Sequence, residues 1–319
     1  MVSSIILLVL KASIALLVFG IGLTSTPRDA GFLLRHRRLF AQTLLSMHVA
    51  MPVLTIWLCR VFALNPAVEI ALLALSISPV PPFLPSKVTK AGGDDAYTMS
   101  LVITTALLAI VIVPASLWAL GGLFTLPTDT STRMVIKVVA GTVLGPMAIG
   151  LGVGHFSPAA GRAGKRVQLF ATILLAAAAL PIIVRSWPAF RTLIGNGTLA
   201  AIVAFTLAGL GVGHLLGGPV PEHRTVLALA TSSRHPAVAI TIATADFPGN
   251  KLIVAAVLLA LIVSAAASAP YVVSSQRRAR TRLRPATPAT PATPAPTTSG
   301  AESTSESGLH VGHSRSRES

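Results

Sequence analysis

Long apolar runs separated by short polar loops make up most of this sequence. A helix needs about 20 apolar residues to cross roughly 30 Å of hydrocarbon. Seven uninterrupted segments of this kind lie near residues 3–23, 39–63, 97–122, 134–156, 165–186, 198–217 and 249–274. Each of them predicts a membrane-spanning helix.

Two further apolar segments are interrupted by proline. The first, residues 66–93, contains the sequence PVPP at 79–82 and then Pro85. The second, residues 222–249, contains RHP at 234–236. Because proline lacks a backbone donor and blocks continuation of a helix, each segment is expected to form two half-helices that meet inside the membrane. With the seven uninterrupted runs this gives an all-α polytopic membrane protein of about nine transmembrane helices.

The two broken segments occupy comparable positions in the two halves of the chain. Non-helical backbone at membrane depth is tolerated only where protein buries it or a water-filled cavity hydrates it. Broken helices in corresponding halves indicate an inverted repeat, with the breaks crossing at a transport site near the midplane. The alternative is a pair of proline kinks that serve packing alone. Charged and hydroxyl residues beside both breaks weigh against it.

Composition agrees with a membrane protein. The chain has 319 residues, of which 53% are hydrophobic and 11% charged, and its mean hydropathy is +0.76. So little polar surface excludes an ordinary soluble domain. The formal net charge of +15 resides in short loops and a terminal segment, so no nucleic-acid partner is inferred. A single cysteine, Cys59, leaves no internal disulfide.

The loop charges predict an orientation in the cell (inner or plasma) membrane. We expect the first apolar run to be a retained span rather than a signal peptide, because Lys11 interrupts it and no basic segment precedes it. With the N-terminus outside, the cytoplasmic side receives Arg28, Arg35, Arg37, Arg38, Lys90, Arg162, Lys165, Arg166, Arg224, Arg277, Arg278, Arg280, Arg282 and Arg284. The other side then holds only Arg60, Arg133, Arg185, Arg191 and Lys251. The positive-inside rule favours this orientation.

The composition changes near the C-terminus. Residues 1–275 are predicted to form the transmembrane transporter domain. Residues 276–319 are rich in Arg, Pro and Ser and contain "ATPATPATPAPTTSG". Such a segment has no apolar surface to bury and is expected to be a disordered cytoplasmic tail.

Four stretches, in order and spacing, resemble the bile acid:sodium symporter superfamily between about Ile5 and Tyr271. They are "GIGLTSTPRD", "LLRHRRLFAQTLLSMHVAMP", "PSKVTKAGG" and "RTVLALATSSRHPAVAITIA". The chain is similar to the nine-span form of that family. The resemblance implies a secondary transporter with an inverted repeat, two crossing broken helices and a small organic substrate.

The resemblance also assigns positions for a first sodium ion. Ser86, Ser100 and Thr104 keep the family's hydroxyl ligands at the family spacing. Lys87 stands at the asparagine position and Ala230 at the glutamate position. A lysine beside the same cavity would repel sodium by roughly 4 kcal/mol at about 4 Å for an effective dielectric of 20.

The second sodium site of the family is altered as well. Met47 stands at a glutamine position, and Arg234 and His235 replace a glutamine-asparagine pair, with Ser233 beside them. Sodium coupling is therefore disfavoured. His235 offers an alternative proton carrier, because histidine titrates near neutral pH, or a hydrogen-bond partner for backbone at the break. No cofactor or bound metal is expected.

The replacements make the site more positive and predict an organic anion as substrate. Lys87 would substitute for the sodium ion, and the forked donors of Arg234 suit a carboxylate or sulfate. Two structural alternatives remain open. Lys87 could extend along a short half-helix to cytoplasmic water, and Arg234 could cap carbonyls released by Pro236.

Other functional classes remain as alternatives. A sodium-coupled symporter of the family type is one, and a non-transporting membrane sensor with the carrier fold is another. An enzyme is not expected: "GGDD" is only distantly similar to intramembrane aspartyl proteases, and Asp246 lies at the opposite membrane end. An arsenite exporter would need a thiol near the break, whereas Cys59 lies toward the outer end of its span. The oligomeric state and the substrate are left open.

Overall fold

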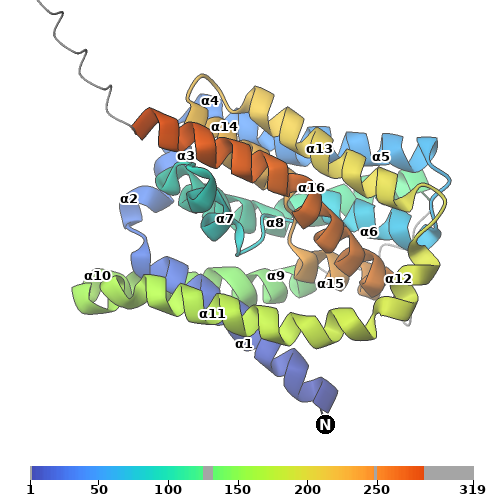
Figure 1. Cartoon of the computed structure of the whole chain (residues 1–319), viewed down its shortest axis with the longest axis horizontal. Coiled ribbons are helices and arrows are strands. Elements are labelled where there is room, and N and C mark those ends of the chain that lie inside the picture. The colour runs from blue at the N-terminus through green and yellow to red at the C-terminus, as the bar shows by residue number, and fades with distance from the viewer. Residues whose placement is uncertain (1, 125–131, 248–249, 284–319) are drawn as a thin grey trace, which may run out of the picture. The chain divides into compact units, whose positions relative to one another are not determined.

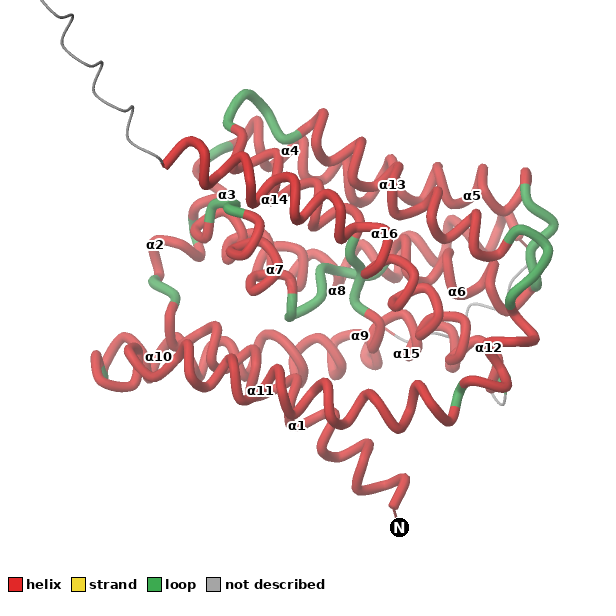
Figure 2. Tube along the Cα trace, in the orientation of Figure 1, coloured by secondary structure: helices red, strands yellow, loops and turns green. Residues whose placement is uncertain are grey.

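The computed structural model describes residues 2–124, 132–247 and 250–283. Throughout these ranges the regular structure is helical (Figure 2). The first half contains α1 (Val2–Thr24), α2 (Pro27–Ala30), α3 (Phe32–Arg35), α4 (Arg37–Leu44), the π-helical segment η1 (Leu45–Ala50), α5 (Met51–Val61), α6 (Pro66–Ile77), α7 (Leu84–Ala91) and α8 (Asp95–Phe124). The second half contains α9 (Thr132–Val139), the π-helical segment η2 (Ala140–Leu144), α10 (Gly145–Phe156), α11 (Pro158–Arg185), α12 (Trp187–Leu193), α13 (Thr198–Leu216), α14 (Pro221–Ser232), α15 (Pro236–Asp246) and α16 (Lys251–Leu283).

The helices confirm a polytopic membrane protein. Over the described ranges, seven helical segments are long and apolar enough to span a bilayer, and two shorter apolar helices, Leu8–Thr24 and Pro66–Ile77, accompany them. Together they fall on the nine segments expected from the hydropathy pattern.

The last helix is longer than its apolar run. Helix α16 continues to Leu283, whereas a disordered segment was expected to begin at residue 276. The extension contains arginines and no proline before Pro285. Arginine is a good helix former, and a cation near a helix C-terminus interacts favourably with the helix dipole. The remainder of the expected tail, residues 284–319, lies outside the described residues.

Both expected breaks are present as non-helical backbone. Helix α6 ends at Ser78, whose extended conformation precedes Pro79. Helix α7 has Pro85 in its first turn and ends at Gly92, which adopts a left-handed conformation (φ 76°) that suits glycine. In the second half, α14 gives way to extended backbone at Ser233, and α15 begins at Pro236. Proline is tolerated at these helix starts because the first N–H groups have no intrahelical acceptor.

Two groups of helices make up the part of the chain between residues 2 and 283. Helices α1, α10 and α11 pack against one another along one side, and α4–α8 and α13–α16 form the other side (Figure 1). Glycines allow close packing within the first group. A Cβ on Gly22 would approach the carbonyl oxygen of Met147 to 2.5 Å, which is shorter than a normal contact. Both breaks therefore belong to the second group.

Candidate substrate and ion site

The two breaks touch each other. The backbone N–H of His235 donates to the carbonyl oxygen of Pro79 at 2.9 Å. The Arg234 Nη1 donates to the carbonyl oxygen of Ser78 at 3.2 Å. Both bonds join residues 78–79 of the first break to residues 234–235 of the second. Non-helical backbone from each half thus supplies partners for the other, which is how such backbone is stabilised away from water.

Arg234 holds two carbonyl groups in place. Its side chain is 4% exposed. Besides Ser78, it donates from Nη2 to the carbonyl oxygen of Met47 at 3.0 Å. Met47 lies in η1, where π-helical geometry interrupts the usual hydrogen-bond ladder. The capping role expected as an alternative is present, but the carbonyls come from the first break and η1.

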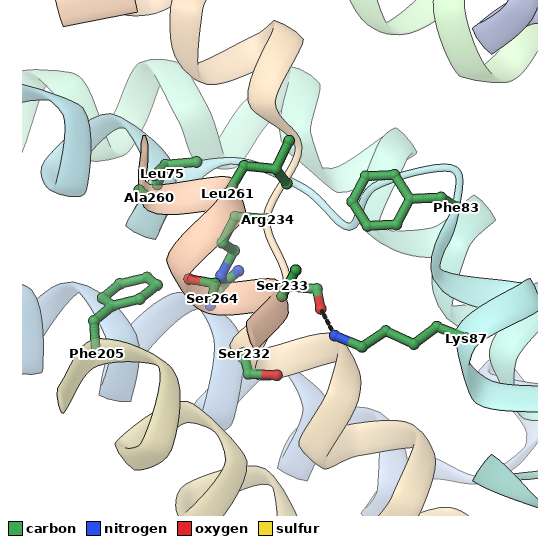
Figure 3. A pocket seen from close by; sticks show the side chains of 11 residues that line it. Leu75, Phe83, Lys87, Phe205, Ser232, Ser233, Arg234, Ala260, Leu261 and Ser264 are labelled. Atoms are coloured by element: carbon green, nitrogen blue, oxygen red, sulfur yellow. Dashed lines mark hydrogen bonds between the residues drawn. The ribbon is translucent and has the colours of Figure 1, made fainter. Parts of the chain in front are cut away.

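Lys87 points inward from α7 to the second break. Its ammonium donates to Ser268 Oγ on α16 at 2.8 Å and to Ser233 Oγ at 3.4 Å; Figure 3 shows the second contact. No acidic residue in the described part of the chain forms an ion pair with it. This direction weighs against a lysine that reaches out along α7 to water.

Lys87 and Arg234 line the same small cavity. The cavity has a volume of about 40 Å³ (Figure 3). Its polar lining comes from Lys87, Ser232, Ser233, Arg234 and Ser264. Its apolar lining comes from Leu75, Phe83, Phe205, Ala260, Leu261 and Ala265. Two cations and three hydroxyls therefore meet between largely apolar walls.

Two of the three hydroxyl residues expected as sodium ligands form hydrogen bonds with backbone groups. Ser86 Oγ donates to the carbonyl oxygen of Phe83 at 2.9 Å. Ser100 Oγ accepts a hydrogen bond from the backbone N–H of Leu33 at 2.7 Å. Thr104 is buried on the same helix as Ser100. None of these three hydroxyl residues lines the cavity that contains Lys87.

The other expected site residues are dispersed around the crossing. Ala230 is fully buried in α14, and Met47 contributes its carbonyl oxygen rather than its side chain. The ring of His235 is 1% exposed, and neither nitrogen has a hydrogen-bond partner among the described residues. It faces an apolar cavity of about 170 Å³ formed by α1, α11, α15, α16 and the first break.

A larger polar cavity lies between the two groups of helices. Its volume is about 440 Å³. It is lined by Ile21, Thr24, Ser25, Asp29, Pro85, Ser86, Thr89, Lys90, Asp95, Ala96, Met99, Lys165 and Gln168. Among the expected site residues, only Ser86 appears in this lining.

Sequence reasoning missed the contribution of α16. Ser264 lines the small cavity, and Ser268 accepts the hydrogen bond from Lys87. Their spacing of four residues places both hydroxyls on one face of the apolar part of α16. That spacing was the available signal. It could not indicate that this face of α16 would contact Lys87.

A bundle of apolar helices in which two broken helices meet, with polar side chains at the meeting point, defines a membrane transporter of the secondary type. The sequence model of the Sodium Bile acid symporter family matches residues 12–189. The chain belongs to this family, as the sequence resemblance indicated. Its members are transporters and not enzymes. A comparison with curated proteins found no significant match. The matched residues include the first break and Lys87 but end before α14 and α15.

Proposed function

We propose that the protein is a secondary transporter of a small organic anion that works by alternating access without sodium coupling. In this proposal Lys87 supplies the positive charge that sodium supplies in the symporters. The observation that carries it is the position of the Lys87 ammonium, which lies at the second break and donates hydrogen bonds to the hydroxyls of Ser233 and Ser268.

The remaining oxygen ligands support the absence of sodium coupling. Sodium needs several hard oxygen donors at close range, and Ala230 offers no side-chain oxygen. Ser86 donates its hydroxyl hydrogen to the carbonyl oxygen of Phe83, and Ser100 Oγ accepts the backbone N–H of Leu33. A buried guanidinium, Arg234, is held beside the second break. A cation would therefore meet two positive side chains and few donors, which favours an anion at this position.

The two interhelical cavities support alternating access. The polar cavity includes Ile21 of α1, and the apolar cavity includes Ile14 of the same helix. At about 1.5 Å per residue, these positions are roughly 10 Å apart along the axis. Both cavities lie against α1 and α11, and each is also lined by residues near the crossing of the two breaks. A substrate with an anionic group and an apolar body suits the two linings.

Uptake into proteoliposomes tests the proposal. Organic anions that raise the thermal stability of the purified protein would be chosen as labelled substrates. Accumulation is expected to persist when sodium is replaced by choline at constant pH and membrane potential. Uptake that vanishes in choline would establish a sodium-coupled symporter. Ligand binding without time-dependent accumulation would establish a sensor.

A further inference from the structure

A buried cation, Arg234, and a half-buried cation, Lys87, share the small cavity at the crossing without a counter-charge. Lys87 and Arg234 both line it, and neither forms an ion pair with an acidic residue in the described ranges. A charge removed from water is costly unless it is paired and hydrogen-bonded. Apolar walls such as Phe83 and Phe205 raise this cost. The arrangement therefore favours an occupant of negative charge.

Donor groups at the cavity remain without acceptors. The Nε of Arg234 is buried and has no hydrogen-bond partner among the described residues. The Lys87 ammonium has three N–H donors, and two of them are used by Ser268 and Ser233. Ser233 is 7% exposed, and its oxygen receives the bond from Lys87. A buried donor without an acceptor calls for a specific explanation. A bound anion supplies an acceptor for the third Lys87 donor and a counter-charge for both cations.

The size of the cavity limits the occupant. A water molecule needs about 10–15 Å³ of such space, and the cavity has about 40 Å³. That is enough for a halide ion and a water molecule. A whole organic molecule would not fit, although one terminal anionic group would.

We propose that the cavity lined by Lys87, Arg234 and Ser233 binds a compact monovalent anion, and that chloride occupies it when no substrate is bound. The donors are the Lys87 ammonium and the Ser233 hydroxyl, and the buried Arg234 guanidinium adds positive charge. The proposal rests on the proposed function in one respect: the anionic group of a substrate would displace the chloride. Chloride and substrate should then compete.

Thermal unfolding of the detergent-solubilised full chain provides the first test. The reference anion is gluconate, whose carboxylate is attached to a chain of hydroxyl groups that the apolar walls of the cavity disfavour. It would be replaced by chloride or bromide at constant ionic strength and sodium concentration. Both halides are expected to raise the unfolding temperature by at least about 2 °C. The rise should be lost in Lys87→Met and kept in Lys90→Met. Lys90 is on the same helix but does not line the small cavity. Because both variants replace a lysine with methionine, the control makes the same change of charge away from the proposed site.

Three outcomes would overturn the inference. They are equal stability in chloride and gluconate, an undiminished halide effect in Lys87→Met, and a halide effect lost equally in Lys90→Met. The first outcome would indicate a neutral Lys87 amine with no bound anion. If Lys87→Met does not give monodisperse protein, Ser233→Ala takes its place. This variant is expected to need a several-fold higher chloride concentration for the same rise in unfolding temperature. An unchanged chloride requirement in Ser233→Ala would then count against the site.

Uptake measurements separate this inference from the proposed function. Chloride should raise the KM for the organic anion and leave the maximal rate unchanged. Sodium-independent uptake that is insensitive to chloride would overturn the chloride site and leave the proposed transport intact. If halides stabilise the protein through Lys87 but no organic anion is taken up, the chloride site would stand and the proposed transport would be wrong.

Discussion

At the scale of single residues, the two cations of the crossing have different partners. The Arg234 guanidinium donates to two backbone carbonyls from distant segments and so holds the breaks together. The Lys87 ammonium contacts two hydroxyls, which leave its charge uncompensated. Arginine suits the first role because its planar fork can reach two acceptors at once. The lysine ammonium is a compact charge with rotatable donors. It is therefore better suited than arginine to exchange a hydroxyl partner for an anionic group of the substrate.

Replacement of Lys87 by alanine should weaken substrate binding. The variant removes the ammonium, and Ala230 and Met47 provide no replacement charge. We expect the affinity for the organic anion to fall at least tenfold, about 1.4 kcal/mol, in a titration followed by thermal stability or uptake. The matched control is Lys251→Ala, which removes an exposed lysine that lines none of the three cavities described above, and its affinity should be unchanged. Unchanged affinity in Lys87→Ala would show that the lysine does not act on the substrate.

At the scale of helices, glycine spacing determines how closely α13 and α14 approach. Gly209, Gly213 and Gly217 recur every fourth residue and face α14. A Cβ on Gly213 would lie 2.6 Å from the Cα of Ala228. Small residues at this spacing allow helix backbones to pack directly in a membrane. The packing holds α14, and with it the second break, against the rest of its group.

Alanine substitutions on α13 can distinguish the effect of close helix packing on stability from the effect of helix propensity. Gly213→Ala is expected to destabilise the protein by about 1–3 kcal/mol, because the neighbouring backbone of α14 cannot yield as a flexible side chain would. Gly211 is two residues away on the same helix, and a Cβ there meets nothing within 4 Å. Gly211→Ala should therefore be neutral or slightly stabilising. Equal unfolding temperatures for the two variants would contradict the close contact.

At the scale of the whole molecule, the basic loops gather at one end of the helices. Rings of Phe32 and Tyr97 contact the ring of His223, which brings the starts of α3, α8 and α14 together. Arg282 near the end of α16 forms an ion pair with Glu222 at 3.0 Å. The segments that carry most loop arginines therefore lie on the same side. The positive-inside rule predicts that this side faces the cytoplasm.

Reporter fusions should reveal this orientation. After Arg284, a reporter that works in the cytoplasm is expected to be active and a reporter that works outside is expected to be inactive, because α16 ends on the basic side. The complementary fusion in the loop at residue 195, which follows α12 on the opposite side, should be active only with a reporter that works outside. Activity of the C-terminal fusion exclusively on the outside would reverse the assigned topology.

Much of the architecture could be predicted because it depends on local properties. Twenty consecutive apolar residues are expensive in water wherever they occur, so the spans could be located from hydropathy. The breaks could be located because Pro79 and Pro236 cannot continue a helix. The start of α8 follows a local rule too, because the Asp94 carboxylate accepts the backbone N–H of Tyr97, as aspartate commonly does at a helix N-terminus. The end of α16 was predicted too early, at residue 275 rather than Leu283, because arginines occur in helices and in polar tails alike.

The sequence by itself determined the class of protein, the number and order of apolar segments, and the unusual cations at both breaks. Only the tertiary structure decided what those cations contact. Met47 and Arg234 are separated by 187 residues and Lys87 and Ser268 by 181, so no local pattern could pair them. A buried polar group must satisfy its hydrogen bonds with whatever the fold brings near. For that reason hydropathy fixes where the chain crosses the membrane, whereas side-chain partners at the crossing depend on how the two halves pack.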